Sequence, residues 1–118
     1  MAAELPESDW RVLRKLRKVA LERFCERVLG ELESVVSDKQ TASHRRYLMI
    51  YELIQERDSA IAQAFNDPRR SNALVQLSII ISLDLVTEDE LRSFTPRTQS
   101  VVAELGKTRR DGRAIKRA

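Results

Sequence analysis

The chain has 118 residues, of which 42% are apolar and 33% are charged, and its formal net charge is +3. This length fits one domain, and the apolar share is too high for a disordered chain. With only three glycines and three prolines, the chain also lacks the frequent tight turns of an all-β fold. The composition therefore predicts a single helical domain with a core of its own.

The positive charge is concentrated at the C-terminal end. Residues 107–118 hold six of the 21 basic residues and one of the 18 acidic residues, a net charge of +5, which leaves −2 for residues 1–106. Because so polar a segment has little apolar surface to bury, we expect residues 107–118 to form a disordered basic tail. The folded domain is then expected to comprise residues 1–106.

The first predicted helix is long. Ser8 is its expected N-cap, and apolar residues recur every three or four positions as far as about Ser37, which places them on one broad helical face. The apolar residues outside this face include Trp10, Leu21 and Leu29. We expect these three residues to form an interaction surface, because a domain of this size has few helices left to cover them.

The second predicted helix follows a short connection. Ser43 is its expected N-cap, and its apolar residues keep the helical spacing as far as about Phe65. Since the connection is short, we expect the first two helices to form a long antiparallel hairpin.

Asp58 interrupts the apolar stripe of this second helix, and the helical period places it on the buried side. An unpaired buried carboxylate is costly, so we expect Asp58 to have a partner, such as Arg69 or Arg70. Two alternatives are a carboxylate that anchors a ligand and a simple exposed residue.

The third predicted helix is apolar nearly all round. Asp67 and Pro68 supply an N-cap and a first helical residue, and the helix is expected to end near Leu83. An isotropic apolar surface is typical of a central, covered helix. We expect three of its residues to be inaccessible to solvent: Leu77, Ile80 and Ile81. A β-strand through the isoleucine run is disfavoured, because the chain offers no second strand to pair with it.

Two short helices are predicted to follow. The segment Thr87–Glu90 has the sequence of a capping box and opens a helix that ends near Phe94. A Thr-Pro pair at 95–96 then opens a last helix to about Leu105, which Gly106 is expected to end.

Groups that carry catalysis or bind metals are sparse in this sequence. The chain has one histidine, His44, and one cysteine, Cys25, which fall on different predicted helices. Its three glycines are too far apart for a phosphate-binding loop, and no His-Glu-x-x-His or paired-cysteine motif is present. We therefore expect a protein that is not an enzyme and that has no cofactor and no metal.

Two arginine pairs lie in the first turns of predicted helices, where the helix macrodipole disfavours cations. They are Arg45 with Arg46, and Arg69 with Arg70. Together with free backbone amides, such arginines can bind an anion or an acidic partner. We favour the other interpretation, in which each arginine pairs with a nearby carboxylate of the chain.

The basic tail indicates a second class of function. Its cations, including Arg109 and Arg110, can neutralise the phosphates of a nucleic acid, although no aromatic residue is interleaved for base stacking.

These patterns predict an all-α bundle of five helices: a long hairpin, a central apolar helix and two short C-terminal helices. The leading functional hypothesis is a non-catalytic interaction module that forms a homodimer or docks on another protein. The alternative is a nucleic-acid-associated protein that uses the tail and the arginine pairs. A single cysteine favours the reducing cytoplasm, and no apolar run reaches the length of a membrane span.

Overall fold

The computed structural model describes the backbone of residues 5–117 and the side chains of residues 5–107. This part of the chain contains five helices and no strand. They are α1 (Glu7–Ser37), α2 (Ser43–Phe65), α3 (Ala73–Ser82), α4 (Glu88–Arg92) and α5 (Pro96–Arg117). The prediction of a mostly helical protein with five helices is confirmed, and the isoleucine run lies in α3.

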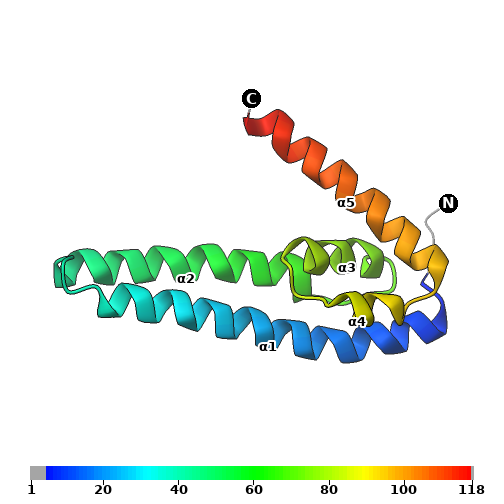
Figure 1. Cartoon of the computed structure of the whole chain (residues 1–118), viewed down its shortest axis with the longest axis horizontal. Coiled ribbons are helices and arrows are strands. Elements are labelled where there is room, and N and C mark those ends of the chain that lie inside the picture. Colours follow the sequence, from blue (N-terminus) through cyan, green and yellow to red (C-terminus); the bar gives the residue numbers. More distant parts are fainter. Residues whose placement is uncertain (1–4, 118) are drawn as a thin grey trace.

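Helices α1 and α2 run side by side in opposite directions along the longest axis of the molecule (Figure 1). The molecule measures 52 × 35 × 25 Å, and the 31 residues of α1 span most of that length. Helices α3 and α4 lie beside one end of this pair, and α5 leaves the same end at an angle (Figure 1). One end of the hairpin is therefore covered by other helices, whereas the other end projects away from them.

The hydrophobic core lies at the covered end, in two clusters that share helices α1 and α3. The first cluster contains Leu5, Leu13, Leu16, Ala73, Leu77, Phe94 and Val102. The second contains Ala20, Phe24, Ala64, Phe65, Ile80 and Leu85. Leu77 and Ile80 of α3 are completely inaccessible, as the sequence predicts, while Ile81 is only half-buried.

The projecting end contains no buried residue. Residues 25–63, which we call the distal arm, comprise the second half of α1, the connection 38–42 and most of α2, and none of them is buried. The buried residues of the described chain all lie in segments 5–24 and 64–102. The hairpin is thus packed into the core at one end only.

Several helix starts follow local signals in the sequence. Helix α4 begins with the predicted capping box, in which the Thr87 hydroxyl accepts from the Glu90 amide at 3.1 Å and the Glu90 carboxylate accepts from the Thr87 amide at 2.9 Å. Helix α5 begins at Pro96. The predicted caps of the two long helices are wrong by one residue or more, because Ser8 and Ser43 lie inside α1 and α2.

Helix α3 begins later than the sequence predicts. Asp67 has a φ of 53° and is therefore no N-cap, which requires an extended residue. The side chain of Asn72 closes the loop instead, since it accepts from the Arg69 amide at 2.9 Å and donates to the Asp67 carbonyl at 3.0 Å. The prediction of a helix from Pro68 is wrong because this loop must turn the chain between α2 and α3.

Gly106 does not end the last helix. Helix α5 continues through it to Arg117, and no glycine of the described chain has the positive φ of a left-handed helix end. The backbone bonds of a continued helix outweigh the cost of its two internal glycines, Gly106 and Gly112, which is about 1 kcal/mol each. The prediction of a helix end at Leu105 is therefore wrong, since the backbone stays helical as far as Arg117.

Candidate functional site

Large apolar side chains are exposed along one face of the distal arm. They are Leu29 (59% exposed), Val36 (51%), Tyr47 (66%), Tyr51 (56%) and Ile54 (47%). We call these five residues the apolar face. They make up most of the exposed large apolar residues of the described chain, since only Val19, Leu48 and Val75 are comparably exposed outside it.

The spacing of these residues explains why they share a face. Leu29 and Val36 are seven positions apart on α1, and Tyr47 and Ile54 are seven apart on α2. Seven residues make two helical turns, so each pair lies along one side of its helix. Leu29 and Ile54 also line one groove of about 220 Å³ between the two helices. The apolar sides of α1 and α2 therefore point the same way.

Asp58 lines the same groove and is exposed. It makes no hydrogen bond or ion pair with any described residue, and the expected partners Arg69 and Arg70 bind Asp67 and Glu7 instead. The prediction of a buried, paired Asp58 is wrong. The stripe that contains it faces solvent, because no helix covers that side of the distal arm.

The three residues predicted to form an interaction surface lie in different environments. Trp10 is half-buried against the first core cluster, and the Arg70 guanidinium lies 5.5 Å from the centre of its ring. Leu21 is half-buried against the second cluster. Only Leu29 is exposed, so the structure does not bring the three together, because the core end covers most of Trp10 and Leu21.

The arginine pairs act mainly within the chain. Arg46 donates to the Val36 carbonyl at 2.5 Å, in the last turn of α1, and to the Thr41 carbonyl at 3.0 Å, in the connection 38–42. Arg69 pairs with Asp67 and Arg70 with Glu7, each at 2.6 Å. Arg45 is exposed and has no polar partner among the described residues. The side chains of Arg109 and Arg110 lie outside the described residues.

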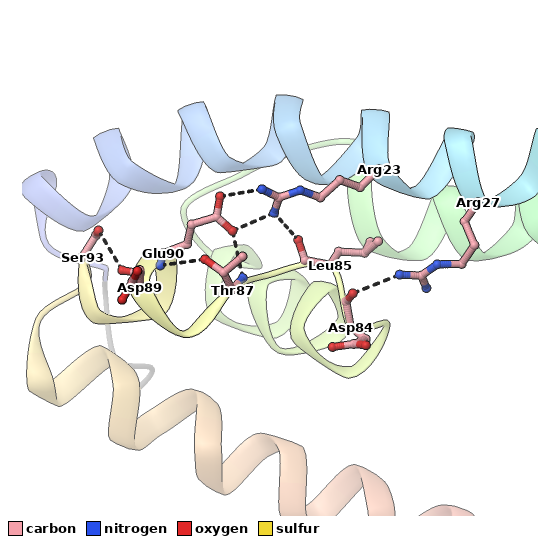
Figure 2. Close-up of polar contacts among 8 residues, drawn as sticks. All are labelled: Arg23, Arg27, Asp84, Leu85, Thr87, Asp89, Glu90 and Ser93. Carbon is pink, nitrogen blue, oxygen red and sulfur yellow. Dashed lines mark hydrogen bonds and ion pairs between the residues drawn. The ribbon is translucent and has the colours of Figure 1, made fainter.

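Two further arginines of α1 bind the end of α3, and sequence reasoning missed them. Figure 2 shows Arg23 and Arg27 reaching from α1 toward the backbone that follows α3. Arg23 donates to the Leu85 carbonyl at 2.8 Å, and Arg27 donates to the Leu83 carbonyl at 2.7 Å. Cations at the C-terminal end of a helix complement its macrodipole. This contact depends on α1 lying beside α3, which no local pattern in the sequence reveals.

Arg23 also binds Glu90, the acidic member of the capping box (Figure 2). The guanidinium and the carboxylate make two parallel hydrogen bonds of 2.7 and 2.9 Å. The bonds from Arg23, together with those from Thr87, lower the pKa of Glu90 to about 2. The same pairing raises the pKa of Arg23. The Arg23 guanidinium thereby joins α1 both to the backbone that follows α3 and to the start of α4.

Asp9 is the most deeply buried charged residue of the described chain, with 1% of its surface exposed. Its carboxylate accepts from the Thr95 amide at 2.9 Å, from the Thr95 hydroxyl at 2.7 Å and from the Thr98 hydroxyl at 2.6 Å. These donors lie at the start of α5, where the macrodipole favours a negative charge. Asp9 therefore attaches α5 to α1 and is a structural group.

Inside the distal arm, one ion pair links the two helices. Arg57 of α2 donates to Glu31 of α1 at 2.8 and 3.2 Å, and this bonding lowers the pKa of Glu31. Arg57 lines the groove, and both side chains of the pair are partly exposed. It aligns the helices without covering the apolar face.

The described side chains include no cluster of three or more histidine, cysteine or acidic residues that could hold a metal ion. Nor is any helix in the described segment long and apolar enough to cross a membrane. Comparison of the chain with protein-family models, curated proteins and solved structures gives no match.

Proposed function

We propose that this protein is a non-catalytic module of the cytoplasm that works by self-association through the apolar face of its distal arm. The observation that carries the proposal is the contrast within the hairpin: residues 25–63 include no buried residue, yet five large apolar side chains lie exposed on one side of them. A single free thiol, Cys25, suits a reducing compartment.

A two-helix arm has no third layer against which to bury its apolar side. Helices in water owe most of their stability to the packing of an apolar face rather than to helix propensity. A contiguous exposed apolar patch of this kind usually marks an interaction site. A second pair of helices laid on the face would convert the arm into one half of a four-helix bundle.

A second copy of the chain fits this face in size. The five residues of the apolar face span only about 10 Å along the helices, but the side of the distal arm on which they lie is longer. At about 1.5 Å per residue and about 10 Å per helix, that side measures roughly 30 by 20 Å along residues 43–63 of α2, which is roughly 600 Å² from each copy. Two copies together reach the total of about 1,000 Å² that a specific interface needs. The five residues of the face are uncharged, so two copies can approach without repulsion between like charges.

Sedimentation equilibrium at micromolar concentration tests this proposal. We expect the full chain to have the mass of two copies, and Ile54→Asp to shift it to the mass of one copy. Val75→Asp is the matched control, because Val75 of α3 is 45% exposed against 47% for Ile54 but lies outside the apolar face. A single-copy mass for the unmodified chain up to hundreds of micromolar would refute self-association.

A further inference from the structure

The two ends of the apolar face carry different polar groups. His44, Lys39 and the Tyr47 hydroxyl lie at the tip of the arm, beside the connection 38–42, whereas Asp58 lies at the end nearest the core. All four residues are exposed, and within the described chain none of them has a hydrogen-bond or ion-pair partner. The rings of His44 and Tyr47 are stacked with their centres 6.5 Å apart. The tip thus offers donors and positive charge, and the core end offers a carboxylate.

These groups belong to one stripe of α2. His44, Tyr47, Tyr51, Ile54 and Asp58 follow one another at alternating spacings of three and four, which keeps them on the same side of the helix. Tyr51 is the midpoint, seven positions from His44 and seven from Asp58. A half-turn about Tyr51 therefore superimposes the two ends of the stripe on each other.

A second copy can cover the face with twofold symmetry in two directions. In the first direction the two tips lie together, and α2 of one copy covers α1 of the other. Each Asp58 then lies opposite Cys25 and Leu29 of the other copy, because these three residues line the same groove in one chain. A carboxylate that loses its water against apolar groups is strongly destabilising. If the tips point in opposite directions, α2 covers α2 and each Asp58 faces the polar tip of the other copy.

We infer that two copies pair antiparallel, with Tyr51 near the twofold axis and Asp58 of each chain beside His44 and Tyr47 of the other. This inference rests on the proposed self-association, and it adds the direction and the register. The Tyr47 phenol and the His44 ring are donors for the carboxylate, and Lys39 contributes positive charge at the same end. The dimer makes this set of contacts twice.

Disulfide trapping distinguishes the two directions, because a disulfide requires Cα atoms about 4.4–6.8 Å apart. In a Cys25→Ser background, the antiparallel pairing is expected to convert most of a Tyr51→Cys sample to a covalent dimer under mild oxidation. Glu52→Cys is the control that should stay uncrosslinked, since Glu52 is exposed on the other side of α2 and lines a different groove. Both substituted residues are exposed in the free chain, so neither variant disturbs the core.

A second pair of cysteine variants tests the alternative dimer, in which the two tips lie together. A mixture of Leu29→Cys chains with Ile54→Cys chains is expected to form little mixed disulfide in the antiparallel dimer, whereas a tips-together dimer would give mainly that product. Reversal of charge in Asp58→Lys is expected to weaken association tenfold or more, and Glu56→Lys, on the opposite side of α2, should change it less than twofold.

These experiments test the antiparallel pairing separately from self-association itself. A Cys25→Ser chain that sediments as a dimer, but whose Tyr51→Cys form fails to crosslink, overturns the antiparallel pairing and leaves self-association intact. A Cys25→Ser chain that sediments as a single copy at every concentration removes both.

Discussion

Helices α1 and α2 pass through two different environments, the core end and the distal arm. At the core end, Leu13 and Leu16 of α1 are buried with Leu77 of α3. In the distal arm, Leu29 and Ile54 are equally apolar and keep the same helical spacing, yet about half of their surface is exposed. The comparison shows that periodicity identifies the residues that share a face, whereas the placement of other helices decides whether that face is covered.

Charged side chains at the core end have partners within the chain, whereas a charged side chain beside the apolar face does not. At the core end, α1 arginines bind the ends of other helices: Arg17 donates to the Phe65 carbonyl at the end of α2, and Arg23 and Arg27 bind the end of α3. Beside the apolar face of the arm, Asp58 has no such partner among described residues. The three arginines at the core end thus complete contacts within the monomer, whereas the Asp58 carboxylate is available to a second chain.

The largest contrast is expected from truncating one apolar residue in each region. Phe24→Ala removes a side chain that is 4% exposed in the second core cluster, and it is expected to lower the free energy of unfolding by about 3–5 kcal/mol. Ile54→Ala is expected to change it by about 0.5 kcal/mol or less in the free monomer. Urea unfolding at nanomolar concentration, where association is negligible, measures both. Equal losses would mean that the arm is packed as tightly as the core end.

Two aspartates sharpen the comparison. Asp9→Ala leaves the Thr95 amide and the hydroxyls of Thr95 and Thr98 without their acceptor, and it is expected to lower the free energy of unfolding by about 3 kcal/mol. Asp58→Ala is its control and should change monomer stability by less than about 0.5 kcal/mol. Thermal unfolding of the two variants under identical conditions gives the difference. A large loss of stability in Asp58→Ala would instead support the buried Asp58 that the sequence predicts.

Acid should weaken the core end through Glu90. Its pKa of about 2 in the folded chain lies below the ordinary value of 4.5. The ionised Glu90 carboxylate therefore stabilises the folded chain fully above pH 4.5, and this contribution is lost as the pH falls toward 2. The reason is that Glu90 binds its proton more tightly in the unfolded chain than in the folded chain. Since the pair is partly exposed, we expect a loss of about 1 kcal/mol. Denaturant unfolding at pH 6 and pH 3 should show a larger loss in the unmodified chain than in Glu90→Gln, and equal losses would contradict this role.

The smallest effect is expected from the ion pair within the arm. A double-mutant cycle with Glu31→Gln and Arg57→Met should give a coupling energy of about 0.5 kcal/mol, as for other partly exposed pairs. The bond to Arg57 lowers the pKa of Glu31, so this coupling is present at neutral pH and falls away in acid as the carboxylate is protonated. A coupling above about 2 kcal/mol would show that the pair, rather than a second chain, supplies most of the order in the arm.

Local signals in the sequence determined a large part of the secondary structure. The range of α2, the capping box at Thr87 and the start of α5 at Pro96 all agree with the structure, because each depends on residues within a few positions of one another. The burial of Leu77 and Ile80 was also predictable. A helix that is apolar on all sides is buried, and this conclusion does not require knowledge of which elements pack against it.

Only the tertiary structure decided what lies over each helix face and which distant groups meet. Asp9 and Thr98 are 89 positions apart, and Arg23 and Glu90 are 67 apart, so no pattern along the chain identifies either pair. The exposure of Asp58 follows from the position of α3 against the end of α2, which leaves the rest of the arm uncovered (Figure 1). The helical period assigns a residue to a side of its helix, and burial requires a second element on that side.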